Sequence, residues 1–206
     1  MRLLGRTGLV VFTLCAIIAA GSARAASDPA ATVKHFYAAL TETMEHGAQL
    51  GDKGRYEQLS PSIRQSFALA SMAQMAVGPS WARLSPAERQ QVTEAFARYT
   101  IATYAEHFSK NDGEKLEVGG AKPTPYGTIV ETTIVERGGN ATSINYLLRQ
   151  NGDEWQVADV YLQGTISQIA NLRSQFSNVV LNGGAQALVE TLDRKTASLV
   201  PSVAAS

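Results

Sequence analysis

Residues Thr142–Leu162 read TSINYLLRQNGDEWQVADVYL, with runs of aromatic and β-branched residues on either side of an Asn151-Gly152 pair. The composition of these runs predicts two strands, Thr142–Gln150 and Glu154–Leu162. Asn-Gly is the strongest short-range signal for a two-residue hairpin turn, so the two strands are expected to pair antiparallel. This hairpin forms the second half of the predicted sheet.

Two further strand-like runs precede the hairpin, at Glu114–Val118 and Gly127–Val135. The turn residues Gly138-Gly139-Asn140 separate the second of these runs from the hairpin. Connections this short leave no room for a crossover helix, so neighbouring strands must be antiparallel. We therefore expect a four-stranded, mostly antiparallel meander sheet.

Helical patterns lie on both sides of the predicted sheet in the sequence. The clearest helix start is Ser85-Pro86-Ala87-Glu88, a capping box with proline at the first helical position. Helical periodicity predicts helices from Pro29 through Leu40, and over Tyr56–Phe67, Ala68–Val77, Pro86–Phe108, Ile166–Leu181 and Ala185–Leu199. This order predicts an α+β fold, a single domain with helices on one face of the sheet, similar to an NTF2-like cone with extra helices.

The first 25 residues have the parts of a secretory signal peptide. Arg2 and Arg6 form a positive n-region, residues 9–20 form an apolar h-region, and Ala23-Arg24-Ala25 places small residues where a signal peptidase reads them. Cleavage is predicted after Ala25, with export to the periplasm. Two alternatives are a retained membrane anchor and a lipoprotein attached at Cys15. The apolar run is shorter than the roughly 20 residues of a spanning helix, and the leucine before Cys15 is too bulky for a lipobox.

The predicted mature chain contains no cysteine, so an apolar core must hold it together. Loss of Arg2, Arg6 and Arg24 lowers Lys plus Arg from 18 to 15 against 18 acidic residues, a net charge of −3. No basic run remains, which argues against a nucleic-acid partner. Residues 26–200 are predicted to form one domain and residues 201–206 a flexible tail.

The mature sequence lacks the usual patterns of a catalytic or metal site. It has neither Gly-x-Ser-x-Gly nor Ser-x-x-Lys, and His35, His46 and His107 do not have metal-ligand spacing. We predict neither a metal nor a cofactor. Asp159, on a predicted strand, is the one candidate general base, which would make the protein a small NTF2-like enzyme. The structural alternative is a carboxylate that pairs with an arginine or caps a backbone N–H.

The sequence contains more apolar residues than are needed to cover one face of the sheet. Met72 and Met75 lie in a segment rich in alanine, and methionine adapts to ligands of varied shape. Both faces of the last two predicted strands carry apolar residues, with Val157 and Tyr161 alternating with Val160 and Leu162. Such a sheet is either covered on both faces or lines a cavity, and periodicity leaves both possibilities open.

Several blocks of the sequence resemble the MlaC family, also called the toluene-tolerance Ttg2 family. The likeness covers roughly residues 29–197 in family order. The blocks are Gly78–Arg89, Ala95–Tyr99, Tyr104–Phe108, Gly113–Val118, Ile144–Arg149 and Trp155–Val160. Two further blocks, Asp159–Ser167 and Arg173–Phe176, resemble most closely the HpnM branch associated with hopanoid biosynthesis. The loop Gly119–Pro125 does not match the family pattern.

This resemblance implies a periplasmic lipid carrier that is not an enzyme and needs no cofactor. Such carriers bind phospholipid or hopanoid-type lipids in an apolar pocket, as monomers, and shuttle them between an inner-membrane MCE-domain ABC transporter and an outer-membrane lipoprotein complex. Arg83 and Arg173 are candidates for contact with a head group. Our candidates for the lipid-binding residues are Phe67, Met72, Met75, Phe96, Tyr99, Val130, Tyr146, Val157, Tyr161, Ile166, Ile169 and Phe176. A third possibility is an adaptor that binds only proteins and has no pocket.

Overall fold

The structure of the protein is a computed structural model that describes residues 28–204. The predicted signal peptide, its cleavage site and Cys15 lie outside the described residues. Within the described part of the chain, none of the helices combines the length and the apolar character that crossing a bilayer requires.

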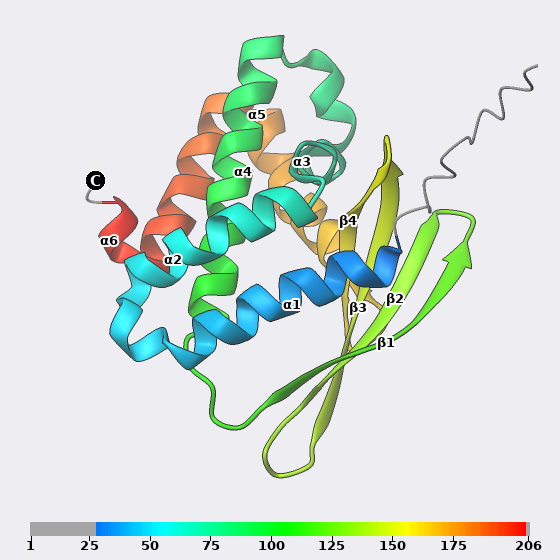
Figure 1. Ribbon diagram of the computed structural model, residues 1–206. Coiled ribbons are helices and arrows are strands. Elements are labelled where there is room, and N and C mark those ends of the chain that lie inside the picture. The colour runs from blue at the N-terminus through cyan, green and yellow to red at the C-terminus, as the bar shows by residue number, and fades with distance from the viewer. Residues whose placement is uncertain (1–27, 205–206) are drawn as a thin grey trace, which may run out of the picture.

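Helices form the first half of the chain and its end, and strands lie between them (Figure 1). The helices of the first half are α1 (Pro29–Glu45), α2 (Gly47–Ser66), α3 (Leu69–Val77), the 3-10 helix η1 (Gly78–Arg83) and α4 (Pro86–His107). The strands are β1 (Lys115–Thr124), β2 (Gly127–Val135), β3 (Ala141–Asn151), β4 (Glu154–Leu162) and β5 (Ile166–Ser167), followed by α5 (Gln168–Leu199) and α6 (Pro201–Ala204).

The sheet is an antiparallel meander in the order β1-β2-β3-β4-β5. The four predicted strands are present, and the described chain adds a fifth, because Leu162 pairs with Ile166 before α5 begins. The predicted helix start at Ile166 is therefore wrong by two residues. The unmatched segment after Val118 is also strand, since β1 resumes pairing at Ala121 after an irregularity and continues to Thr124.

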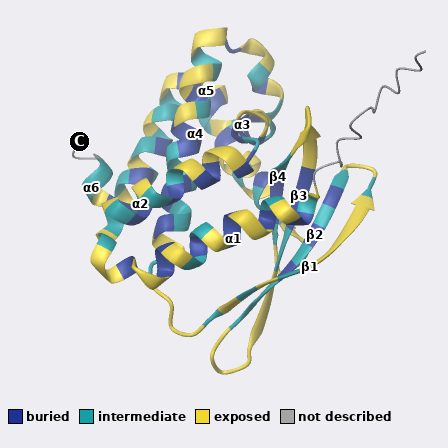
Figure 2. Cartoon of the chain, in the orientation of Figure 1, coloured by how far each residue is buried: buried dark blue, intermediate teal, exposed yellow. Residues whose placement is uncertain are grey.

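The helices lie on one side of the twisted sheet, and α1, α2, α3 and α5 contact it (Figure 1). The first helix crosses β1, β2 and β4, while α4 packs between α2 and α5. Buried side chains concentrate on the inward faces of these helices and on β2–β4 (Figure 2). This arrangement confirms the predicted α+β fold and places the core between the helical layer and the sheet.

The start of α4 is the predicted capping box. Ser85 Oγ accepts a hydrogen bond from the Glu88 backbone N–H, and Glu88 Oε2 accepts one of 2.7 Å from the Ser85 N–H. The hydrogen bonds from Ser85 hold the pKa of the Glu88 carboxyl below its usual value. This cap fixes where α4 begins.

Helix α5 bends at Gly184, between the two helical stretches predicted at 166–181 and 185–199. Gly184 has φ 68° and ψ −163°, a conformation that favours glycine, and helical geometry resumes at Ala185. The predicted flexible tail differs from the structure, because Pro201–Ala204 form α6, which packs against α5 and α2. Proline at the start of this short helix suits the first helical position.

Candidate functional site

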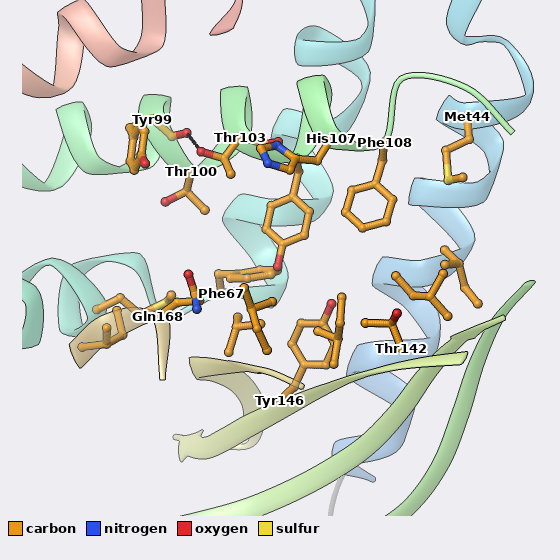
Figure 3. Close-up of a pocket in the computed structure, with 18 of the residues that line it drawn as sticks. Met44, Phe67, Tyr99, Thr100, Thr103, His107, Phe108, Thr142, Tyr146 and Gln168 are labelled. Carbon is orange, nitrogen blue, oxygen red and sulfur yellow. Dashed lines mark hydrogen bonds between the residues drawn. The ribbon is translucent and has the colours of Figure 1, made fainter. Parts of the chain in front are cut away.

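A cavity of about 470 Å³ lies between the helical layer and the sheet. One wall is the inward face of α4, which presents Phe96, Tyr99, Thr103 and His107, and the opposite wall is the sheet (Figure 3). Residues spaced three or four apart lie on the same face of a helix, so α4 supplies a continuous wall. Met44 of α1, Phe67 after α2 and Met72 of α3 also line the cavity.

The hydroxyl groups on the α4 wall are mostly satisfied within the helix itself. Thr100 Oγ1 donates to the Phe96 carbonyl at 2.9 Å, and Thr103 Oγ1 donates to the Tyr99 carbonyl at 2.8 Å. Such back-bonding leaves these hydroxyls with no donor for a ligand. The wall therefore presents a largely apolar surface despite its threonines.

Aromatic rings form the floor of the cavity. The rings of Phe67 and Tyr104 meet edge to face, with their centroids 5.6 Å apart. The ring of Phe36 packs edge to face against both. Phe108 stacks on Tyr104 at 5.8 Å. Edge-to-face packing adds about 0.5–1.5 kcal/mol per pair to the burial energy, so this floor is a rigid part of the core.

Two tyrosine hydroxyls at the cavity are shielded from bulk water. Burial raises the pKa of Tyr104, and it raises the pKa of Tyr146 well above its usual value. Both phenols therefore remain protonated over the physiological range. Their hydroxyls are among the polar groups of the cavity lining.

Ionisable side chains gather at one end of the cavity, where the α4–β1 and β2–β3 connections lie. His107, Lys110, Glu114 and Glu136 line it there, and Lys110 Nζ pairs with Asp112 at 2.6 Å. The hydrogen bond to Asp112 raises the pKa of Lys110. Cationic and anionic groups are mixed at this end, so it presents no single sign of charge.

The structure places half of the candidate lipid-binding residues at the cavity. Those six are Phe67, Met72, Phe96, Tyr99, Tyr146 and Ile169. Val130, Val157 and Phe176 are instead buried in the surrounding core, at most 1% exposed. These three face the same apolar interior, but neighbouring side chains separate them from the cavity.

The remaining three candidates, Met75, Tyr161 and Ile166, do not line the cavity. For Tyr161, which lies on β4, the reason is a β-bulge. Leu147 pairs with Asp159 but Leu148 pairs with Val157, which leaves Ala158 as an extra residue. The extra residue breaks strict alternation, so Val160 and Leu162 line the cavity and Tyr161 does not. Ile166 is 45% exposed, and Met75 lies outside the cavity against Arg173.

Several lining residues were not singled out from the sequence. Tyr104 lies four residues after Thr100, on the same face of α4, so helical spacing could have identified it from the sequence. Met44, Ile144 and Leu172 come from separate elements, and only the tertiary structure brings them together.

Neither arginine considered for a head group lines the cavity. Arg83 donates to Ser80 Oγ at 2.9 Å, and Arg173 donates to the Met75 carbonyl at 2.7 Å. The charged residues that do line the cavity are Lys110 and Glu114 of the α4–β1 connection and Glu136 of the β2–β3 connection.

Asp159 has the structural role that the sequence left open. Its Oδ2 accepts a 2.5 Å hydrogen bond from the Ser167 hydroxyl, and Oδ1 accepts from the backbone N–H groups of Val160 and Ile169. The carboxylate lies at the N-terminus of α5, where a negative charge is favourable. It is 8% exposed and is not among the residues that line the cavity. Among residues 28–204, no cluster of His, Cys, Asp or Glu has the arrangement of a metal site.

A helix-covered antiparallel sheet that encloses an apolar cavity defines a class of α+β domain suited to an apolar ligand. The family model described as MlaC protein matches residues 34–194, and the chain belongs to this family. The structure is also similar to that of the phospholipid-binding protein from Ralstonia solanacearum in complex with a phospholipid. The TM-score is 0.73 at 22% identity, over 84% of this chain and 99% of that one, which establishes a common fold. The curated proteins include no significant match.

Proposed function

We propose that the protein is a non-catalytic lipid carrier of the periplasm that encloses acyl chains in the cavity beneath α4. The observation that carries this proposal is the apolar lining of a space of about 470 Å³, within the roughly 300–1,000 Å³ of small-molecule sites. Each methylene kept from water contributes about 0.8 kcal/mol. A chain enclosed by Phe67, Phe96 and Ile169 would therefore be held without any catalytic group.

The distribution of polar groups supports an amphiphile in one orientation. Aromatic and aliphatic side chains predominate in the interior, and the ionisable residues His107, Lys110, Glu114 and Glu136 lie at one end. An acyl chain would enter the interior while the head group remained beside these residues in water. A fully apolar ligand would not need such a charged end.

The similar structure from Ralstonia solanacearum supports phospholipid as the ligand class, since that protein was solved with a phospholipid. A hopanoid-type lipid is the second ligand class, and its support is the resemblance of residues 159–167 to the hopanoid-associated branch. The alternative of an NTF2-like enzyme has no observation in its favour, because the hydrogen bonds of Asp159 are taken up at the start of α5. The cavity likewise disfavours an adaptor without a pocket.

The transport role rests on the family relationship and on the N-terminal sequence. Cleavage after Ala25 would release a monomeric carrier attached to neither membrane. Its proposed partners are an inner-membrane MCE-domain ABC transporter and an outer-membrane lipoprotein complex. A freely diffusing carrier is what exchange between two membranes requires.

The test is lipid extraction from the protein made with its own N-terminus in a Gram-negative host. We expect the protein in the periplasmic fraction, an N-terminus at Ala26, and about one lipid per protein by mass spectrometry of an organic extract. Recovery of folded protein without stoichiometric lipid would contradict the proposal.

A matched pair of variants shows whether the lipid occupies this cavity. Thr103→Phe fills space at the lining, whereas Thr191→Phe changes a comparable half-buried helical threonine away from it. Both threonines donate to the carbonyl four residues earlier, so both variants lose the same internal bond. We expect T103F to lose most of its lipid and T191F to retain it. Equal loss in both variants would place the lipid elsewhere.

A further inference from the structure

Met75, near the end of α3, contacts two arginines from other elements. Arg173 of α5 donates from Nε to the Met75 carbonyl at 2.7 Å, and Arg149 of β3 places Nη1 3.8 Å from the Met75 sulfur. Arg149 also donates from Nε to the Tyr126 carbonyl at 3.0 Å, at the turn between β1 and β2. Helix α3 contacts both α5 and β4, which brings these elements together (Figure 1). We refer to Met75, Tyr126, Arg149 and Arg173 as the Met75 patch.

The two guanidinium groups of the patch are held in place without a carboxylate. Each donates from Nε to a backbone carbonyl, which leaves its positive charge unpaired. Among residues 28–204, neither of them takes part in an ion pair, whereas Arg55, Arg64 and Arg98 each have a carboxylate oxygen within 4.0 Å. A guanidinium group fixed through Nε keeps its terminal nitrogens for a further acceptor, and less side-chain entropy is lost when that acceptor binds.

A groove of about 420 Å³ lies between Met75 and the first turns of α5. Met75 and Ile169 give it apolar walls, and Arg173 lines it as well. The serine hydroxyls of the lining already donate within the protein, namely those of Ser167, Ser174 and Ser177. Among the described residues that line this groove there is no carboxylate. The Arg173 guanidinium is therefore the side-chain group there that can bind an acceptor, and it does so beside an apolar wall.

We propose that the Met75 patch is a docking surface for a partner protein that presents carboxylates beside an apolar side chain. Arg149 and Arg173 bind the carboxylates, and the apolar side chain enters the groove against Met75. Tyr126 is 74% exposed and adds an aromatic contact of the kind that stabilises protein interfaces. This surface is separate from lipid binding, since no residue of the patch lines the lipid cavity.

The shape of the surface favours a protein over an anionic membrane. A side chain that projects from a partner can fill a groove of this depth, whereas the flat surface of a bilayer cannot enter it. The carboxylate of Asp159, which influences the pKa of Tyr161 together with Arg149, does not occupy either arginine. Its oxygens instead accept hydrogen bonds from Ser167 and from two backbone N–H groups.

The experiment selects binders of the purified protein from a displayed library of short random peptides. We expect the enriched peptides to combine aspartate or glutamate with a leucine, methionine or aromatic residue. A synthetic peptide of the enriched sequence is then titrated against the wild type and against Arg149→Glu/Arg173→Glu. Its affinity should fall at least about tenfold in R149E/R173E, because charge-assisted hydrogen bonds are lost and like charges meet.

A second variant keeps the test independent of how well the double variant folds. Tyr126→Ala removes a side chain that is 74% exposed and retains the carbonyl that holds Arg149. It should weaken binding of the same peptide several-fold.

The matched control is Arg137→Glu/Arg194→Glu, which makes the same change of charge at two exposed arginines outside the patch. It should bind the peptide within about twofold of the wild type, since distant exposed charges contribute little. Enriched peptides without acidic residues, or equal weakening in R149E/R173E and R137E/R194E, overturn the proposal. So does sedimentation of the wild type, but not of R149E/R173E, with vesicles of phosphatidylglycerol and phosphatidylcholine, which would make the patch a membrane contact.

Lipid extraction from the same preparations separates this proposal from the lipid-carrier function. R149E/R173E should retain as much lipid as the wild type, because neither arginine lines the cavity. Loss of lipid from R149E/R173E would mean that the arginines support the cavity, and would overturn the docking surface. A wild type that carries no lipid overturns the carrier function alone, and the peptide titrations still decide the role of the patch.

Discussion

The carboxylate of Asp159 on β4 accepts a hydrogen bond of 3.1 Å from the backbone N–H of Ile169 in the first turn of α5. Ile169 lines the cavity, and its strand and helix are joined by a tight connection through β5. A carboxylate at this place satisfies N–H groups that the helix itself leaves unpaired. Asp159 therefore positions one wall of the cavity without touching its interior.

Replacing Asp159 should lower stability. Asp159→Ala leaves the Ser167 hydroxyl and the Ile169 N–H without their buried acceptor, which costs roughly 1–3 kcal/mol in the free energy of unfolding. Urea denaturation followed by circular dichroism measures the change. Glu117→Ala, an exposed carboxylate on β1, is the control and should shift stability by less than about 0.5 kcal/mol. Equal effects would show that Asp159 does not secure α5.

The capping box of α4 should make stability depend on pH. The pKa of Glu88 is lowered from 4.5 in the folded protein by its hydrogen bonds to Ser85. A lowered folded pKa means that the carboxylate stabilises the fold above pH 4.5, and this contribution disappears as the pH falls through the folded value. Glu88→Gln should therefore flatten the loss of stability below pH 4.5. Denaturation midpoints between pH 6 and pH 3 test this, and a slope identical to that of the wild type would contradict it.

Two residues predicted together as lipid contacts should behave differently. Phe176 is buried in the core at 1% exposure, so Phe176→Ala should cost roughly 3–5 kcal/mol in the free energy of unfolding. Tyr99 faces the cavity on one side, so Tyr99→Ala should cost clearly less while weakening acyl-chain binding several-fold. Chemical denaturation and fatty-acid titration separate the two effects. A greater stability loss for Y99A would mean that the cavity is collapsed in solution.

The charged end of the cavity should influence head-group preference. Glu114 and Glu136 oppose an anionic head group there, so the Glu114→Lys/Glu136→Lys variant should favour phosphatidylglycerol over phosphatidylethanolamine by a few-fold more than the wild type. Raising the salt concentration should weaken this shift, because exposed charges are screened. Glu117→Lys, on the same strand as Leu116 but outside the lining, is the control. An equal shift in the control would indicate a general charge effect.

Local signals in the sequence predicted most of the elements, but only six of the 23 residues that line the cavity. The Asn151-Gly152 turn and the Ser85–Glu88 box act over a few residues, so the hairpin and the start of α4 could be recognised without the rest of the chain. The residues of β4 that face the cavity could not be recognised from the sequence, because strict alternation fails at Ala158. A bulge depends on how two strands pair, and the sequence of β4 by itself does not indicate one.

The sequence by itself determined the order of helices and strands, the meander and the apolar surplus, because turn chemistry and periodicity are properties of contiguous residues. Only the tertiary structure decided which apolar residues line a space and which fill the core, since that depends on where separate elements meet. It also decided the role of Asp159, whose partners lie across a turn, and the contact of Tyr37 with Thr132, 95 residues apart. Such hydrogen bonds form only where donor and acceptor come within bonding distance, and the packing of the surrounding core brings them there.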